Sequence, residues 1–175
     1  MKHSVKLRFI MLTLFSMLII MNVNAQNAPT PYNENQDARE DLKQAVERAK
    51  QENKNILVQF GGNWCPWCLR FHALVNGTPK LDSLMKENYV YLLLNVPREK
   101  EKRDFSLFRE FEYPNRLGYP VFVILDKNGK RLNTQDSDSF EHPDPKVKGY
   151  DTTKVARFLT MWTPKALDPN AYPIK

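Results

Sequence analysis

The chain has 175 residues, of which 42% are hydrophobic and 26% are charged, the size of one ordinary domain with a short extension. This length leaves little room for a second lobe, and the sequence contains no repeat or low-complexity tract, which excludes collagen-like and fully disordered classes. The formal charge is +6, but three of the basic residues lie in the first ten positions, and the rest form no basic stripe that would indicate a nucleic-acid partner.

The N-terminus has the three parts of a secretory signal peptide. A basic segment, residues 1–8, precedes an uncharged apolar run, residues 9–21, which is shorter than the roughly 18–20 residues of a membrane-spanning helix. Val23 and Ala25 then occupy the −3 and −1 positions of a cleavage site. We therefore expect residues 1–25 to be a signal peptide, with an uncleaved signal anchor as the alternative. The mature protein would be exported, periplasmic or extracellular, with no stable membrane span after cleavage.

The segments after residue 25 predict one α/β domain between two terminal extensions. Residues 26–36 are polar, contain two prolines and are expected to form a flexible leader, and residues 164–175 a C-terminal tail. In the intervening domain, residues 37–163, amphipathic patterns predict helices at residues 37–50, 65–75, 78–87, 105–111 and 152–162. Short apolar runs predict strands at residues 56–60, 89–96, 121–125 and 130–133.

Strands that alternate with helices predict a layered α/β sheet with parallel pairing, and the turn signal Asn128-Gly129 adds an antiparallel edge. Thr78 is expected to cap the helix that follows it, and Asp151 or Thr152 the last helix. The polar residues 134–148 are expected to form a long loop. Six aromatic side chains are expected in the core: Phe60, Phe71, Phe108, Phe111, Phe122 and Phe158.

Both cysteines lie in the segment Trp64-Cys65-Pro66-Trp67-Cys68. A disulfide across two intervening residues closes a very short loop and would constrain the chain little, so its use is chemical rather than structural. Cys65 is expected at a helix N-terminus, where unpaired backbone N–H groups favour the thiolate and a nucleophilic attack on a substrate disulfide. Cys68, one turn further and more buried, would resolve the mixed disulfide. Trp64 and Trp67 add apolar surface for an unfolded or peptide substrate.

Two other classes of function fit the same segment. His72 lies on the helical face of the two cysteines, so a copper or zinc carrier using Cys65, Cys68 and His72 is one alternative. Three ligands are fewer than a structural zinc site needs, so we expect no metal, no cofactor and a packing role for His72. A binding or chaperone module with a vestigial disulfide is the other alternative.

Three segments resemble the thioredoxin superfamily, and the similarity covers roughly residues 37–162: the strand at residues 56–60, Trp64-Cys65-x-x-Cys68, and Gly118-Tyr119-Pro120 before a strand. The resemblance implies a thioredoxin fold, with a central mixed β-sheet flanked by helices. It also implies a cis Tyr119–Pro120 bond, with Pro120 beside the sulfurs and Tyr119 binding the substrate backbone. The implied function is thiol–disulfide exchange with protein thiols and disulfides, with a membrane electron-transfer protein as a candidate partner and the redox direction open.

One position departs from that resemblance. Thioredoxin-like reductases usually carry a buried Asp where this chain has Gln59, and that carboxylate assists proton transfer at the resolving cysteine. An amide cannot titrate. The resemblance therefore makes Gln59 the proton-transfer position and predicts that it faces Cys68.

Overall fold

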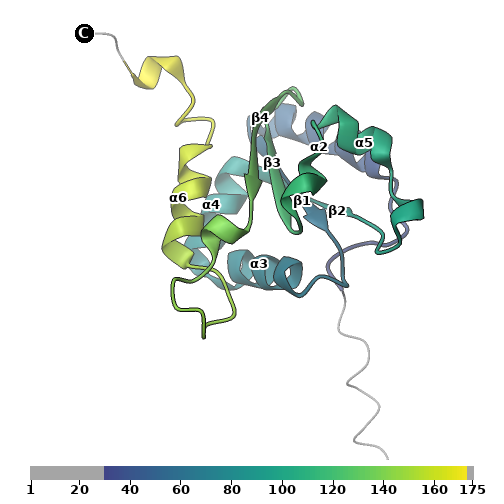
Figure 1. Cartoon of the computed structure of the whole chain (residues 1–175). Coiled ribbons are helices and arrows are strands. Elements are labelled where there is room, and N and C mark those ends of the chain that lie inside the picture. Colours follow the sequence, from purple (N-terminus) through teal and green to yellow (C-terminus); the bar gives the residue numbers. More distant parts are fainter. Residues whose placement is uncertain (1–29, 173–175) are drawn as a thin grey trace, which may run out of the picture. The chain divides into compact units, whose positions relative to one another are not determined.

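A four-stranded mixed sheet forms the centre of the computed structural model, which describes residues 30–172 (Figure 1). Its strands are β1 (Asn55–Gly61), β2 (Tyr89–Asn95), β3 (Val121–Leu125) and β4 (Arg131–Asp136). They lie in the order β2-β1-β3-β4, with β1 parallel to β2 and antiparallel to β3, and β3 antiparallel to β4. The predicted mixed sheet is confirmed, and its parallel pairing is confined to β1 and β2.

Helices cover both faces of this sheet (Figure 1). They are α2 (Ala38–Glu52), α3 (Pro66–Gly77), α4 (Pro79–Asn88), α5 (Phe105–Glu110) and α6 (Thr152–Met161). Short 3-10 helices occupy the connections at Lys100–Lys102, Pro114–Leu117, Asp138–Phe140 and Pro169–Ala171. Within the described part of the chain, no helix combines the length and the hydropathy needed to cross a bilayer.

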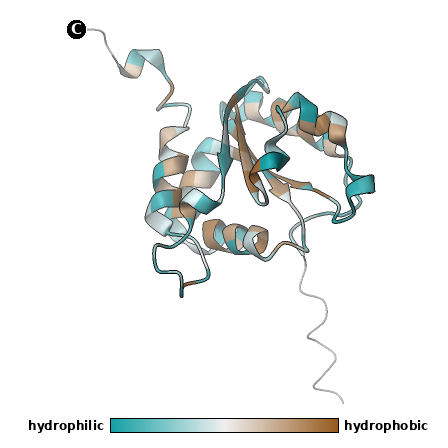
Figure 2. Ribbon diagram, in the orientation of Figure 1, coloured by the Kyte–Doolittle hydropathy of each residue, from teal (hydrophilic) through white to brown (hydrophobic). Residues whose placement is uncertain are grey.

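The alternation of side chains along β1 divides the core into two layers. Ile56, Val58 and Phe60 pack in one cluster with residues of α2 and α5, whereas Leu57 packs in a second cluster with residues of α3, α4 and α6. Because both faces are covered, the whole of β1 is buried, and most of its residues are apolar. Brown, hydrophobic stretches mark the central strands in Figure 2. Gln59 is two positions after Leu57 and therefore lies on the α3 face.

The six predicted core phenylalanines are all buried. A seventh, Phe140, lies within the expected loop at residues 134–148 and packs against Phe158 and Phe122. The same segment includes the last residues of β4 and the 3-10 helix Asp138–Phe140. The segment is polar overall, but Phe140 anchors it to the core. The expected long loop is therefore partly packed in the core.

The helix ends differ in how they are capped. The Asp151 side chain accepts hydrogen bonds from the backbone N–H groups of Thr153 and Lys154 at the start of α6. Thr78 is the residue before α4, but its side chain makes no capping hydrogen bond. Asp151 is thus the cap of the last helix, and the position of Thr78 was predicted correctly without its expected bond.

The expected flexible leader differs from the structure where the structure describes it. Tyr32 is only 2% exposed, and the Gln36 amide donates a hydrogen bond to the backbone carbonyl of Leu93 in β2 at 3.1 Å. Tyr32 and Gln36 therefore attach this segment to the domain, while residues 33–35 between them are exposed. The expected signal peptide, residues 1–25, lies outside the described residues.

Candidate active site

Cys65 is the N-cap residue of α3, and Pro66 occupies the first helical position, where its missing N–H is not needed. The backbone N–H of Cys68 points at Cys65 Sγ, with a distance of 3.2 Å between the two atoms. An N–H group and the positive end of the helix dipole both favour negative charge at this sulfur. A cysteine at a helix N-terminus is a common site for a reactive thiolate in this class of motif.

The two cysteines form a disulfide, with their Cα atoms 5.2 Å apart. Their environments are unequal, because Cys65 retains 4% exposure whereas Cys68 has none. Of the two buried sulfurs, Cys65 is therefore the one nearer to solvent. This asymmetry is the one expected for an attacking and a resolving cysteine.

The loop before β3 closes over the disulfide. The Tyr119–Pro120 peptide bond is cis, the conformation that the resemblance implies, and Pro120 is buried. The carbonyl oxygen of Tyr119 lies 3.6 Å from Cys65 Sγ. Tyr119 and Pro120 lie more than fifty positions after Cys65 in the sequence. They meet Cys65 because β3 pairs with β1.

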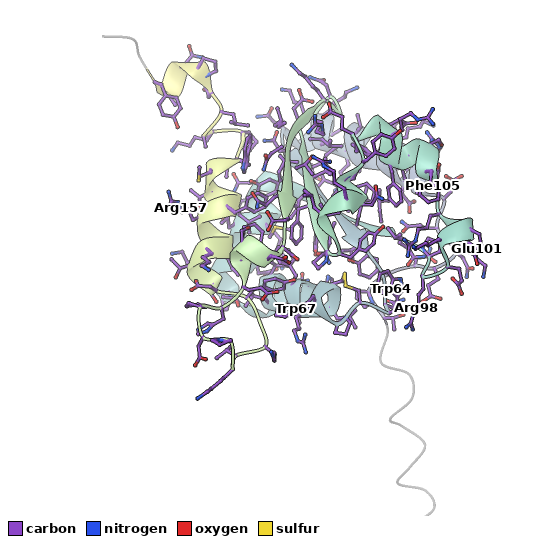
Figure 3. All side chains as sticks on the ribbon, viewed as in Figure 1. Trp64, Trp67, Arg98, Glu101, Phe105 and Arg157 are labelled. Carbon is purple, nitrogen blue, oxygen red and sulfur yellow. A yellow bond between two sulfur atoms is a disulfide. The ribbon has the colours of Figure 1, made fainter. Side chains whose placement is uncertain are left out.

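Two tryptophans flank the sulfur atoms, as Figure 3 shows. The Trp64 indole N–H donates to the carbonyl of Val96 at 2.8 Å, and its ring packs edge-on against Tyr119 at 5.6 Å between centroids. The Trp67 ring packs against Tyr150 at 5.2 Å, and the Arg70 guanidinium lies 5.0 Å from its centroid. Both rings are half-buried, so each has an exposed part beside the disulfide.

A groove of about 350 Å³ adjoins Trp64. Its other lining residues are Glu34, Asn95, Pro97, Arg98, Glu99 and Lys102. A peptide segment in this groove would contact the Trp64 ring and charged side chains of both signs.

Gln59 faces the buried side of the disulfide and has no exposure. Its amide nitrogen donates to the carbonyl oxygen of Cys68 at 3.0 Å and to the hydroxyl oxygen of Tyr32 at 2.6 Å. Its amide oxygen accepts a hydrogen bond from the hydroxyl group of Tyr91. The orientation predicted for Gln59 therefore agrees with the structure, and every polar atom of its amide has a partner.

Tyr32 is a site residue that the sequence analysis missed. The side-chain oxygen of Asn63 accepts from the backbone N–H of Tyr32 at 3.1 Å, and the Asn63 amide nitrogen donates to the backbone carbonyl of Tyr32 at 2.9 Å. This paired contact fixes residue 32 to the turn before Trp64. No periodicity reveals such a contact, because Tyr32 lies in a proline-containing polar segment and its burial is purely tertiary.

Gly61 and Gly62 directly follow the predicted strand at residues 56–60, and they leave space for the side chains of the site. A Cβ atom at Gly61 would lie 2.5 Å from Cys68 Sγ and 2.7 Å from the Tyr32 hydroxyl oxygen. At Gly62 a Cβ atom would lie 2.5 Å from the Trp64 indole nitrogen. A glycine at the end of a strand often marks a close approach of other groups, and this signal was present in the sequence.

His72 lies away from a metal-binding arrangement. Its ring stacks on Tyr91 at 6.0 Å between centroids and contacts the Asn76 amide at 3.2 Å, and burial lowers the pKa of His72. Among residues 30–172, no group of three or more His, Cys, Asp or Glu side chains is close enough together to hold a metal ion. The geometry gives the carrier alternative no support.

A cysteine pair at the start of the helix that follows β1, facing a cis-proline loop, defines the thiol–disulfide oxidoreductases of thioredoxin fold. Residues 37–127 match the family described as thioredoxin-like, which is more than half of the chain, and the chain belongs to this family. Family and site together make the protein a thiol–disulfide oxidoreductase, with the direction of the reaction left open.

One solved structure supports the fold, and two others align with lower TM-scores. A disulphide isomerase from Xylella fastidiosa Temecula1 aligns with a TM-score of 0.63 at 22% identity, over 77% of this chain and 97% of that one. A thioredoxin from Thermus thermophilus aligns with a TM-score of 0.47 at 17% identity, over 76% and 94% of the two chains. A DsbH oxidoreductase aligns with a TM-score of 0.45 at 18% identity, over 77% and 89%. No curated protein matches the sequence.

Proposed function

We propose that the protein is exported and exchanges disulfides with protein substrates, with Cys65 as the attacking cysteine and Cys68 as the resolving one. The observation that carries this proposal is the unequal pair itself. Cys65 Sγ receives the Cys68 N–H at the start of α3 and lies at the surface end of the pair, with 4% exposure against none for Cys68. The signal-peptide pattern of residues 1–25 supports export.

The reductive direction transfers two electrons from the dithiol to the substrate. The Cys65 thiolate attacks one sulfur of a substrate disulfide, the substrate S–S bond breaks, and the released substrate thiolate takes up a proton. Cys68 then loses its proton and attacks Cys65 Sγ. The Cys65–Cys68 disulfide forms, and the second substrate sulfur leaves as a thiolate that is protonated in turn. The oxidative direction is the reverse of these steps.

The surface around Cys65 would hold an extended protein segment. Trp64 and Trp67 offer apolar area on either side of the sulfurs, and the backbone of Tyr119 would pair with the substrate backbone next to Pro120. In the reductive direction, each turnover leaves the protein oxidised. A membrane electron-transfer protein is the partner that we propose for returning it to the dithiol form.

Reduction of insulin disulfides by dithiothreitol tests the activity. The wild-type protein should accelerate insulin precipitation, and Cys65→Ser should abolish the acceleration. Trapping tests the roles of the two sulfurs: Cys68→Ala should accumulate reducible covalent complexes with exported proteins, and Cys65→Ala should not. If neither variant traps a protein and the wild type does not act on insulin, the result would favour the binding-module alternative, with the half-buried Trp64 and Trp67 as its contact surface.

Export is tested separately. The full chain, expressed with its N-terminal segment, should appear outside the cytoplasm with Gln26 as its first residue. A protein that is retained with residues 1–25 attached would contradict the cleaved signal peptide and favour the signal anchor.

A further inference from the structure

Tyr32 reaches the buried side of the disulfide from a segment that precedes the thioredoxin-like match at residues 37–127. It packs in one cluster with Cys65 and Cys68 and is 2% exposed. A buried phenol beside a reactive sulfur is a polar group whose hydrogen bonds can be accounted for one by one.

The amide of Gln59 determines the direction of these hydrogen bonds. A carbonyl oxygen only accepts, so the group of Gln59 that faces the Cys68 carbonyl at 3.0 Å must be the NH2. The second hydrogen of the same NH2 goes to the hydroxyl oxygen of Tyr32 at 2.6 Å. Tyr32 is thus an acceptor toward Gln59, and its own hydroxyl hydrogen is free to be donated elsewhere. In the described part of the chain, the Tyr32 hydroxyl makes no other hydrogen bond.

The sulfur of Cys68 is the group placed to receive that hydrogen. The Tyr32 hydroxyl oxygen and Cys68 Sγ both border the space that a Cβ atom at Gly61 would fill, at 2.7 and 2.5 Å from it. In the disulfide, this sulfur is a weak acceptor. When the disulfide opens and Cys68 becomes a thiolate, it becomes a strong one.

We propose that the Tyr32 hydroxyl donates a hydrogen bond to the Cys68 thiolate and thereby stabilises Cys68 as the resolving nucleophile. This role rests on the proposed disulfide exchange and deepens it. Tyr32 keeps its own proton throughout. The proton that Cys68 loses is taken up through solvent by the substrate thiolate that leaves Cys65, so that one Cys68 thiol is consumed and one substrate thiol is formed.

The environment of Tyr32 suits a donor that does not titrate. Burial raises its pKa far above the usual value for a phenol, and the hydroxyl is therefore protonated at every pH where thiol exchange is fast. The other titratable groups of this cluster are Cys65 and Tyr119. The phenols Tyr91 and Tyr150 are electrostatic neighbours of Tyr32. With Gln59 at the position of the carboxylate of thioredoxin-like reductases, a neutral phenol held by Gln59 would thus be the polar group that serves Cys68.

Asn63 is the positioning residue for this donor. Its amide binds both the N–H and the carbonyl of Tyr32, at 3.1 and 2.9 Å, and so fixes the backbone from which the phenol projects. Removing this amide would loosen Tyr32 without changing any group next to Cys68.

Titration of Cys68 alone tests the proposal without relying on activity. The chain has two cysteines, so Cys65→Ser leaves one thiol, whose pKa can be followed by NMR of 13Cβ-labelled cysteine. Adding Tyr32→Phe should raise the pKa of Cys68 by about one unit, a tenfold loss of thiolate at neutral pH, because a hydrogen bond to a charged group is lost. Tyr91→Phe is the matched control, since it removes the other phenol that binds Gln59, and should shift the pKa by no more than a few tenths.

The outcomes separate this role from a structural one. An unchanged pKa in Tyr32→Phe, or an equal shift in Tyr91→Phe, overturns the proposal. If Tyr32→Phe does not fold, Asn63→Ala keeps the phenol but releases its backbone, and should raise the pKa of Cys68 in the same direction by a smaller amount. An unchanged pKa in folded Asn63→Ala would then overturn it.

Kinetics with both cysteines present give a second readout. Tyr32→Phe should slow the release of a mixed disulfide about tenfold at neutral pH and leave the first attack by Cys65 unchanged. A wild-type protein without exchange activity would refute the proposed function and leave the titration to decide the role of Tyr32. An active wild type with an unshifted Cys68 pKa in Tyr32→Phe would refute the role of Tyr32 alone.

Discussion

Cys65 and Cys68 are three positions apart, yet the fold places one at a helix end and the other inside the core. The helix dipole and the N–H of Cys68 act on Cys65 Sγ, so the reduced protein should have one reactive and one shielded thiol. Limiting iodoacetamide at neutral pH should therefore label Cys65 at least about tenfold faster than Cys68, as measured by peptide mass spectrometry. In urea-unfolded protein the two rates should converge. Equal labelling of the folded protein would contradict the assigned roles.

Gly61 is required by the sulfur that lies next to it. A methyl group there would overlap Cys68 Sγ, which is tied into the disulfide, and the hydroxyl of Tyr32. Gly61→Ala should lower the free energy of unfolding of the oxidised protein by about 1–3 kcal/mol, measured by urea denaturation. Gly77→Ala is the control, because a Cβ atom at Gly77 meets no other atom within 4 Å, and it should be neutral or slightly stabilising.

Gln59→Glu replaces a hydrogen-bond donor with an acid of the same shape. Its carboxyl group would face the carbonyl oxygen of Cys68, which only accepts, and burial also disfavours the charged form. The folded-state pKa of the new carboxyl should therefore rise above its unfolded value of about 4.3. Because this pKa is raised on folding, the Gln59→Glu variant is most stable below the pKa of the unfolded state. Its free energy of unfolding falls as the pH rises through the pKa of the folded state.

Urea denaturation at several pH values checks this sign. Gln59→Glu should approach the wild type near pH 4 and fall below it by on the order of 3 kcal/mol at pH 7. Gln51→Glu, an exposed change on α2, should follow the wild type throughout. A pH-independent difference for Gln59→Glu would mean that the carboxyl group escapes to solvent.

At the scale of elements, patterns within one segment were enough to predict the framework. β3 is a continuous apolar run and β1 is a mostly apolar one, and the structure buries every residue of both. The start of α3 was predictable because Pro66 has no N–H to lose there. These features depend on periodicity or on backbone chemistry, which a sequence shows directly.

Features that depend on contacts between distant segments were not predictable in this way. Tyr32 is buried because Asn63 binds its backbone and Gly61 leaves room for its hydroxyl group. Phe140 joins the core although it lies in a polar stretch. In both cases one aromatic residue anchors a segment whose composition indicates a loop. The average composition of a segment does not reveal a single buried residue within it.

Helix capping offers a test at the same scale. The Asp151 carboxylate accepts two backbone N–H groups of α6, and the N–H of Lys154 is the main cause of its lowered pKa. Asp151→Ala should lower the melting temperature by roughly 3–5 °C at neutral pH, whereas Asp151→Asn should cost much less because it keeps the acceptor. Since the pKa is lowered, the difference between wild type and Asp151→Ala should shrink as the pH falls through that pKa.

Thr78→Ala is the internal comparison for this experiment. Thr78 occupies the same kind of position before α4 but makes no side-chain capping bond. Its replacement should change the melting temperature by no more than about 1 °C. A loss as large as that of Asp151→Ala would show that position, rather than the hydrogen bond, determines the effect.

For the whole domain, buried phenols connect the sheet to its flanking segments. Tyr89, the first residue of β2, donates from its hydroxyl group to the carbonyl of Leu159 in α6, and burial raises its pKa. Burial also raises the pKa values of Tyr32 and Tyr150. Tyr32 connects the N-terminal segment to the site, and Tyr150 connects the segment before α6 to it. The unfolded chain loses these protons near pH 10, whereas the folded chain keeps them.

The sign of this linkage predicts a loss of stability in alkali. Stability that depends on a raised pKa is present below the unfolded pKa and falls as the pH rises above it, by about 1.4 kcal/mol per pH unit for each phenol. Urea denaturation of the oxidised protein between about pH 9 and pH 11.5 should show this fall. Tyr89→Phe should be less stable at neutral pH by about 1 kcal/mol, for the lost hydrogen bond, but its stability should decline less steeply, by one phenol's share. Tyr172→Phe, at a residue that is 66% exposed, should keep the wild-type slope. Parallel curves for the wild type and Tyr89→Phe would mean that the hydroxyl of Tyr89 ionises in the folded protein, and that β2 and α6 are not joined through it.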